Sequence, residues 1–160
     1  MFATYSALPW SASYFPRMRL RLALLLACAP PRILAQGGGD TTITIRALSS
    51  TLEFVPAHIS AKSGARLRIR FVNEGTYPHN FVLAKKDDDV DDLAAAGAQA
   101  AETGFVPLAQ RDKIIAFTRL ISPGETGDVE FIVPAPGQYT FICLFPGHTN
   151  SMIGTLRSLK

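Results

Sequence analysis

The sequence has few cysteines, and from Gln36 onward its net charge is close to zero. Its two cysteines, Cys28 and Cys143, could suggest one disulfide, but Cys28 lies in the N-terminal leader, and a bridge to it would prevent Cys143 from binding a metal. The formal charge is +3, but four of the 16 basic residues precede Gln36, and the other 12 face 13 acidic residues. Because aromatic residues are also not interleaved with a basic stripe, we exclude nucleic-acid binding. The chain has only three histidines, which leaves no ligands for a second metal centre beside the candidate described below.

The first 35 residues have the layout of an export signal. Three arginines between residues 17 and 21 precede the apolar run Leu22–Ala27. This run is too short to span a membrane, and a basic segment followed by a short apolar segment is typical of a secretory signal. Met18 is an alternative start of the chain. We therefore expect an exported protein, in the periplasm or at the cell surface.

Two interpretations of the mature N-terminus stay open. Cleavage after Ala35 would leave a flexible Gly-rich linker, residues 36–40, in front of one domain, residues 41–160. Alternatively, Cys28 closes a bacterial lipoprotein box and carries a lipid, and only then would the protein be held at a membrane.

Short alternating segments separated by Pro/Gly turns predict strands from residue 41 onward. The clearest segment places Leu67, Ile69 and Phe71 on one side and three arginines on the other. The arginines indicate a solvated strand face, with a docking patch for an acidic partner as the alternative. The other predicted strands are residues 41–48, 54–59 (an edge segment interrupted by Pro56), 81–84, 114–121, 127–133, 138–143 and 154–160. This order predicts an all-β sandwich.

Residues 85–108 depart from the strand pattern. The acidic run Asp87–Asp92 precedes an alanine-rich segment, and acidic residues at the start of a helix complement its positive end. The run lacks the spacing and the closing glutamate of a calcium-binding loop. We interpret it as the start of a helical insertion with a solvated surface.

Near the C-terminus, three residues with metal-binding side chains lie close together in the sequence. Cys143 ends a predicted strand, His148 follows a Phe-Pro-Gly turn, and Met152 begins the next strand. Upstream, His79 begins another strand. A thiolate, two imidazoles and a weak thioether are the donor set of trigonal copper sites for electron transfer. The third histidine, His58, has no Cys or Met neighbour, and we interpret it as an ordinary surface or packing residue.

The Cys-x4-His-x3-Met spacing, the Phe-Pro-Gly before His148 and the His79-Asn80 pair resemble the azurin branch of the cupredoxins. The resemblance covers residues 40–160. It implies a Greek-key β-sandwich with a helical flap, holding one copper ion in a type 1 (blue) site. The implied equatorial ligands are His79, Cys143 and His148, and the implied axial ligand is Met152. The implied function is a one-electron carrier rather than an enzyme.

The same resemblance implies roles for neighbouring residues. Asn80 would tie the two ligand loops together by hydrogen bonds, and the backbone N–H of Phe145 would donate toward the sulfur. An exposed face formed by His148, Phe145, Pro146 and Gly147 would dock transiently with a redox partner, such as a cytochrome or a copper oxidoreductase. We expect a monomer.

The sequence departs from the azurin pattern at three places. Pro78 stands where azurins carry a glycine whose carbonyl approaches the copper, so a contact from the Pro78 carbonyl stays open. Asn150 and Ser151 are more polar than the usual residues of the docking face, which predicts weaker docking. The structural disulfide of azurins has no cysteines to form it here.

Three other functions use related ligands. Copper nitrite reductases and oxidases need a second copper centre and a much longer chain, and a binuclear copper site needs two cysteines in the ligand loop. A copper carrier that delivers its metal would use the same four residues, and this alternative stays open.

Overall fold

A computed structural model describes residues 40–48 and 51–160. The predicted leader, residues 1–35, the linker before Asp40 and the lipid-anchor candidate Cys28 lie outside the described residues. The boundaries predicted for these segments therefore stay predictions. Among the helices of the described part, none combines the length and the apolar character needed to cross a membrane.

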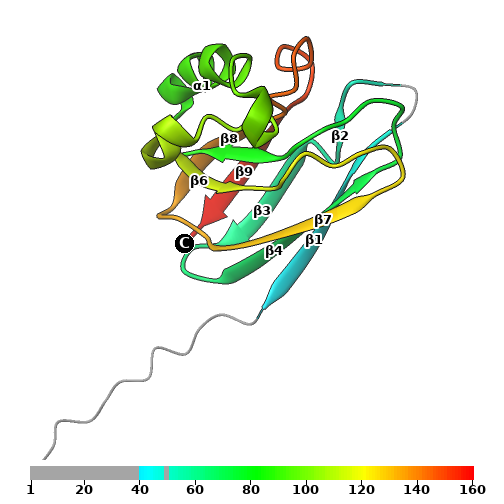
Figure 1. The fold of residues 1–160 in the computed structure, drawn as a ribbon. Helices are drawn as coiled ribbons and strands as arrows, with labels where there is room; N and C mark the ends of the chain where they lie inside the picture. Colours follow the sequence, from blue (N-terminus) through cyan, green and yellow to red (C-terminus); the bar gives the residue numbers. More distant parts are fainter. Residues whose placement is uncertain (1–39, 49–50) are drawn as a thin grey trace, which may run out of the picture. The chain divides into compact units, whose positions relative to one another are not determined.

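The described residues contain nine strands in two sheets (Figure 1). The four-stranded sheet has the order β2 (Phe54–Val55), β1 (Thr41–Ala47), β4 (Arg66–Asn73), β7 (Thr126–Ile132). The five-stranded sheet has the order β3 (His58–Lys62), β9 (Ile153–Leu159), β8 (Gly137–Ile142), β5 (Val82–Ala84), β6 (Ile114–Phe117). The β1–β4 and β3–β9 pairs are parallel, and the other pairs are antiparallel.

Four phenylalanines from both sheets form the centre of the core. The ring of Phe54 lies 5.8 Å from Phe71, 6.3 Å from Phe81 and 5.1 Å from Phe141, in edge-to-face contacts. All four rings are buried, and such contacts stabilise a core beyond the area that they bury. The two sheets are therefore packed face to face around one aromatic centre, and the prediction of an all-β sandwich is confirmed.

The alternation of β4 fixes which side of its sheet faces water. Leu67, Ile69 and Phe71 are fully buried, whereas the arginines between them are exposed. Opposite them on β7, Glu130 accepts hydrogen bonds from Arg68 and lies 3.7 Å from Arg66. Because these exposed ion pairs offset part of the positive charge of the strand, the arrangement favours the solvated face over the docking patch.

Two predicted strands differ from the structure in their extent. The segment predicted as one edge strand, residues 54–59, is two strands, because the chain passes at Pro56 from the edge of one sheet to the edge of the other. Proline cannot donate to a ladder, which is why pairing stops there. The predicted strand 114–121 ends at Phe117, and its last residue, Ile121, instead pairs with His79 in an isolated bridge.

The predicted helical insertion is confirmed. It consists of the α-helix α1 (Val90–Gly97) and three short 3-10 helices, η1 (Asp87–Asp89), η2 (Ala101–Thr103) and η3 (Leu108–Lys113). In Figure 1 this flap lies next to the five-stranded sheet. It packs on the outer face of that sheet through the buried side chains Val82, Ala84, Leu93, Val106, Ile114, Ile142 and Leu144.

One glycine allows the flap to approach the segment after β8. A Cβ at Gly97 would lie 2.9 Å from the carbonyl oxygen of Phe105 and 3.2 Å from Cβ of Leu144. Only a residue without a side chain fits this space. The flap is therefore in direct contact with the loop that carries the candidate metal ligands.

Candidate metal centre

The β8–β9 hairpin brings three of the four candidate ligands to one place. Cys143 follows the last residue of β8, Met152 precedes the first residue of β9, and these two strands are antiparallel neighbours. The backbone N–H of Cys143 donates to the carbonyl of Met152 at 3.0 Å, and the N–H of Met152 donates to the carbonyl of His148 at 2.8 Å. The loop is thus closed on itself by backbone hydrogen bonds.

His79 arrives from a different part of the chain. It lies just before β5, and β5 pairs with β8, so that Val82 is opposite Ile142. The N–H of His79 donates to the carbonyl of Ile121 at 3.0 Å, and the N–H of Ile121 donates back at 2.8 Å. This bridge fixes the backbone of His79 beside the end of β8, where Cys143 lies.

The three side chains converge on one point. Cys143 Sγ lies 3.8 Å from His79 Nδ1 and 3.9 Å from His148 Nδ1, and the two Nδ1 atoms are 3.1 Å apart. A point equidistant from the three atoms lies about 2.1 Å from each of them, within the range of protein metal–nitrogen and metal–sulfur bonds. All three residues are buried. The prediction that they meet is confirmed, and their spacing fits a single metal ion.

The fourth candidate, Met152, is fully buried in the core together with Cys143. A buried thioether beside a thiol and two imidazoles completes a donor set that suits copper better than hard cations such as magnesium or calcium. His58 is exposed on β3 and does not belong to the group that the described residues form.

Burial sets the protonation of the site. It raises the pKa of the Cys143 thiol to about 11, against the smaller opposite effect of hydrogen bonds from the backbone of Asn80 and Phe145. Burial, together with the neighbouring His148, lowers the pKa of His79 to about 4. Burial also lowers the pKa of His148. The protein without metal therefore holds a neutral thiol and two neutral imidazoles at neutral pH, unlike the thiolate–imidazolium pair of a catalytic cysteine.

These pKa values predict how the stability of the metal-free protein depends on pH. Unfolded His79 takes up a proton below its usual pKa of 6.5 while folded His79 stays neutral to about 4, so stability falls as the pH drops between these values. The unfolded thiol ionises above 9.0 while folded Cys143 keeps its proton to about 11, so stability also falls as the pH rises between these values. The free energy of unfolding, measured with urea at a series of pH values, should therefore show a plateau between pH 6.5 and pH 9.0.

Two variants separate these contributions from those of other groups. Cys143→Ser should remove most of the alkaline fall, and His79→Asn should weaken the acid fall. If the stability of the metal-free parent protein and of both variants changed equally with pH, these two groups would not cause the pH dependence.

Asn80 connects three parts of the molecule. It is fully buried. Its Oδ1 accepts a hydrogen bond from the backbone N–H of Leu144 at 2.7 Å, and its Nδ2 donates to the carbonyl of Gly104 at 3.0 Å. The side chain thus links the His79 segment to the ligand loop and to the flap. The link to the flap has no signal in the sequence.

Aromatic rings contact His148, which is itself buried at 5% exposure, so the exposed part of the predicted docking face is formed by its neighbours Pro146 and Gly147. The ring of Phe145 lies 4.8 Å from His148, and the exposed ring of Tyr77 lies 5.8 Å from it. Phe105 of the flap contacts Phe145 at 5.2 Å. The contacts of Tyr77 and Phe105 were not predicted from the sequence. The position of Tyr77 two residues before His79 was the one available signal.

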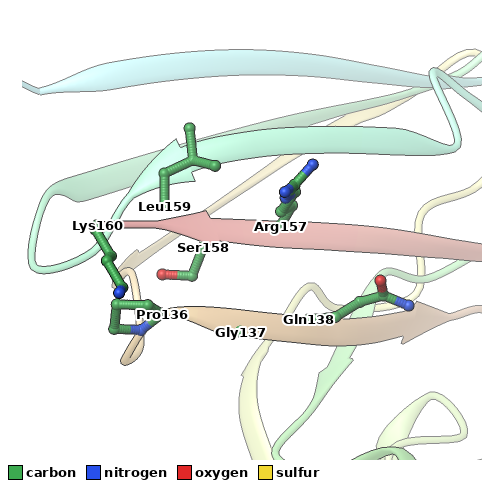
Figure 2. Close-up of a pocket in the computed structure, with 7 residues that line it drawn as sticks. All are labelled: Pro136, Gly137, Gln138, Arg157, Ser158, Leu159 and Lys160. Atoms are coloured by element: carbon green, nitrogen blue, oxygen red, sulfur yellow. The ribbon is translucent and has the colours of Figure 1, made fainter.

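A groove lies at the other end of the β8–β9 hairpin (Figure 2). It is lined by Pro136, Gly137, Gln138, Arg157, Ser158, Leu159 and Lys160. Gly137 pairs with Ser158, five residues of β8 away from the Ile142–Ile153 pair that adjoins the ligand loop. The hydroxyl of Ser158 donates to the carbonyl of Pro134 at 2.8 Å, so it is already bonded within the protein. The groove is therefore remote from the metal centre and offers a control region for experiments.

Comparisons with known proteins agree with this donor set. The model of the plastocyanin/azurin family of copper-binding proteins matches residues 41–158. Auracyanin-B of Chloroflexus aurantiacus is 38% identical over 119 residues, which are 72% of this chain and 51% of that protein. The chain thus spans about half the length of this relative. Azurin iso-2 of Methylomonas sp. (strain J) is 40% identical over 128 residues, which are 74% of this chain and 95% of that protein.

A solved structure of a copper protein has a similar fold. Auracyanin A of Chloroflexus aurantiacus, described as a blue copper protein, superposes with a TM-score of 0.72 at 33% sequence identity. The superposition covers 76% of this chain and 100% of the auracyanin chain.

Proposed function

The chain belongs to the plastocyanin/azurin family of copper-binding proteins, and from this we propose that it is a one-electron carrier with a single copper site. We assign His79, Cys143 and His148 as the equatorial ligands and Met152 as the weak axial ligand. The convergence of one thiol and two imidazoles within bonding distance of one point carries the proposal. Members of this family are electron carriers and generally not enzymes, and we propose no catalytic role.

Copper bound here would supply the redox couple Cu(II)/Cu(I), which accepts and releases one electron. The protein's part is to keep the ligands in place, so that little has to move when an electron arrives. The β8–β9 hairpin bonds hold Cys143 and Met152, and the bridge to Ile121 holds His79. Burial of all four side chains keeps water away from the site. A packed sandwich core supports these residues and makes them rigid.

The backbone around Cys143 favours the thiolate that metal binding requires. Hydrogen bonds from the backbone of Asn80 and Phe145 lower the pKa of this thiol, although burial raises it more. Pro146, the next residue, has no N–H to offer. We propose that these two donors orient the sulfur and adjust the reduction potential of the site, as outer hydrogen bonds do in metal proteins.

We propose that electrons enter and leave at the rim around His148. Phe145 is half-buried there, and Pro146 and Gly147 are exposed. Residues 75–80 and 144–152 include no Asp, Glu, Lys or Arg. A small uncharged rim suits brief contacts with a redox protein such as a cytochrome or a copper oxidoreductase, because such encounters bury little area. The polar side chains of Asn150 and Ser151 would weaken the contact.

A charge placed on this rim should slow electron exchange. Pro146→Lys puts an ammonium group where a partner would cover it, and burying an unpaired charge is unfavourable. We expect the bimolecular rate with a soluble cytochrome c to fall on the order of tenfold. Stopped-flow mixing of the reduced carrier with the oxidised cytochrome measures this rate.

The matched control is Gln138→Lys, which adds the same charge in the remote groove of Figure 2. Its rate should stay near that of the unmodified protein. If both variants slow exchange equally, net charge alone explains the effect, and docking at the His148 rim is wrong.

Copper loading tests the function itself. The metal-free protein should bind one copper ion, develop an intense visible absorption band, lose it with ascorbate and recover it with ferricyanide over many cycles. An electron carrier should keep its copper against a moderate chelator. Rapid transfer of copper to that chelator would instead support copper delivery, and no redox-sensitive band would contradict the proposal.

We propose that the mature protein works outside the cytoplasm, in the periplasm or, with a lipid on Cys28, at the cell surface. The arginines before the apolar run Leu22–Ala27 support export. Mass spectrometry of the mature N-terminus distinguishes cleavage after Ala35 from lipidation of Cys28. A mature protein that retains residue 18 would contradict export by this signal.

A further inference from the structure

Asn73 is a buried polar residue that the proposed function does not yet use. It ends β4 and is fully buried. Its Nδ2 donates to the carbonyls of Tyr77 and Ile121, both at 2.8 Å, and its Oδ1 accepts from the backbone N–H of Gly75 at 2.9 Å. Buried carboxamides are normally bonded in this way. Here, all three partners are backbone groups around one residue, His79.

Each residue that Asn73 bonds either contacts His79 or lies in the same loop. Ile121 exchanges two backbone hydrogen bonds with His79, at 3.0 and 2.8 Å. Tyr77 lies two residues before it in the same loop. A Cβ at Gly75 would lie 3.2 Å from Nε2 of His79, so the backbone of Gly75 lies against the far edge of the imidazole. Asn73 therefore folds the loop around the ring and attaches it to the segment that holds its backbone.

The backbone of Asn73 adds a further attachment. Its N–H donates to the carbonyl of Glu125 at 2.9 Å, and its carbonyl accepts from the N–H of Gly124 at 2.8 Å. The 122–125 turn follows directly on Ile121. Side chain and backbone of Asn73 thus connect β4, the His79 loop and the turn after Ile121.

We propose that Asn73 is the positioning residue for His79, fixing the imidazole so that Nδ1 faces Cys143 and His148 before any metal arrives. The proposal rests on the proposed copper function for its consequence, but the positioning itself concerns the metal-free protein. His148 is held differently, because its loop is closed by the bonds to Phe145 and Met152, and among the described residues the hydrogen bonds of Asn73 do not reach that loop. Loss of the carboxamide should therefore loosen one imidazole and not the other.

The first test uses the metal-free protein. Asn73→Ala should raise the hydrogen-exchange rate of the His79 amide at least about tenfold, because its loop can open locally. The amide of Cys143, in the β8–β9 hairpin, should change no more than global stability requires. Glu74→Gln, in the same loop, loses only the exposed ion pair with Arg46 and should leave both rates nearly unchanged, because exposed ion pairs contribute little to stability. Equal acceleration at His79 and Cys143 would mean a general loss of stability and would overturn the proposal.

The second test uses copper affinity in two backgrounds. Asn73→Ala alone should weaken copper binding about 10- to 100-fold, as loss of an outer hydrogen bond does at metal sites. In His79→Gly protein supplied with free imidazole, Asn73→Ala should bring no further loss, whereas in His148→Gly protein the loss should persist. Equal losses in both backgrounds would overturn the proposal.

Gly75→Ala decides the matter if Asn73→Ala does not fold. It keeps the carboxamide group but places a methyl group 3.1 Å from Oδ1 of Asn73 and 3.2 Å from Nε2 of His79. The variant should therefore push the carboxamide and the imidazole apart and give the same His79-specific exchange. Unchanged exchange at His79 would count against the proposal. If the unmodified protein binds no copper, the proposed function fails, while the exchange experiment still tests the positioning role.

Discussion

Replacing Cys143 with serine is expected to abolish the intense visible absorption of the copper-loaded protein. This band arises from charge transfer between a thiolate sulfur and copper, and a hydroxyl oxygen is a much poorer donor for it. Cys143 is the free cysteine of the described residues and lies at the centre of the donor cluster. Absorption spectra at matched protein and copper concentrations give the result directly.

Two controls separate this effect from misfolding. Serine is nearly the size of cysteine, so the far-UV circular dichroism of the variant should match that of the parent. Met152→Leu should keep an intense band, because a long axial thioether contributes little to it, while the reduction potential shifts. A Cys143→Ser protein that still shows the band would exclude Cys143 as the ligand.

Replacing Asn80 with alanine is expected to destabilise the protein by about 2–4 kcal/mol. The change leaves the buried N–H of Leu144 and the carbonyl of Gly104 without the carboxamide that now bonds both. The Leu144 N–H is buried and the Gly104 carbonyl is partly buried. A fully buried group without a partner costs roughly 1–3 kcal/mol. The free energy of unfolding of the metal-free protein, from urea titration, measures the loss.

The matched control is Asn150→Ala, which removes the same carboxamide from an exposed position in the ligand loop. Surface changes of this kind are usually within about 0.5 kcal/mol. If Asn80→Ala were no more destabilising than Asn150→Ala, the two hydrogen bonds of Asn80 would not hold the ligand loop to the flap.

The metal ligands could be predicted because their chemistry is unusual and three of them are close in sequence. The Cys143-to-Met152 spacing is fixed by one hairpin loop, so local reasoning was sufficient. His79 lies 64 residues from Cys143, and only its residue type and the family resemblance indicate it as a ligand. Only the fold, through the pairing of β5 with β8, explains why it meets the others.

The surroundings of the ligands could not be predicted in the same way. Asn73 and Asn80 act through hydrogen bonds to backbone groups, and a backbone acceptor leaves no trace in the sequence. Phe105 contacts Phe145 from a backbone with φ of 65°, a left-handed conformation that a bulky residue rarely adopts. No sequence pattern therefore indicates that its ring lies beside the ligand loop.

Strand periodicity predicted the sheets well but not where the chain changes sheet. The alternation of β4 and β8 reports burial on one face, which is a local property. At Pro56 the chain passes from the edge of one sheet to the edge of the other. This passage depends on the neighbouring strands, because β2 pairs with β1 and β3 pairs with β9. Such neighbours are set by the whole fold.

X-ray absorption at the copper K edge of the loaded protein identifies the atoms that bind the metal and their distances from it. We expect one short copper–sulfur bond from Cys143, two nitrogen ligands from His79 and His148, and a longer, weaker sulfur contact from Met152. A spectrum with only nitrogen and oxygen ligands, or with no short sulfur bond, would contradict this ligand assignment.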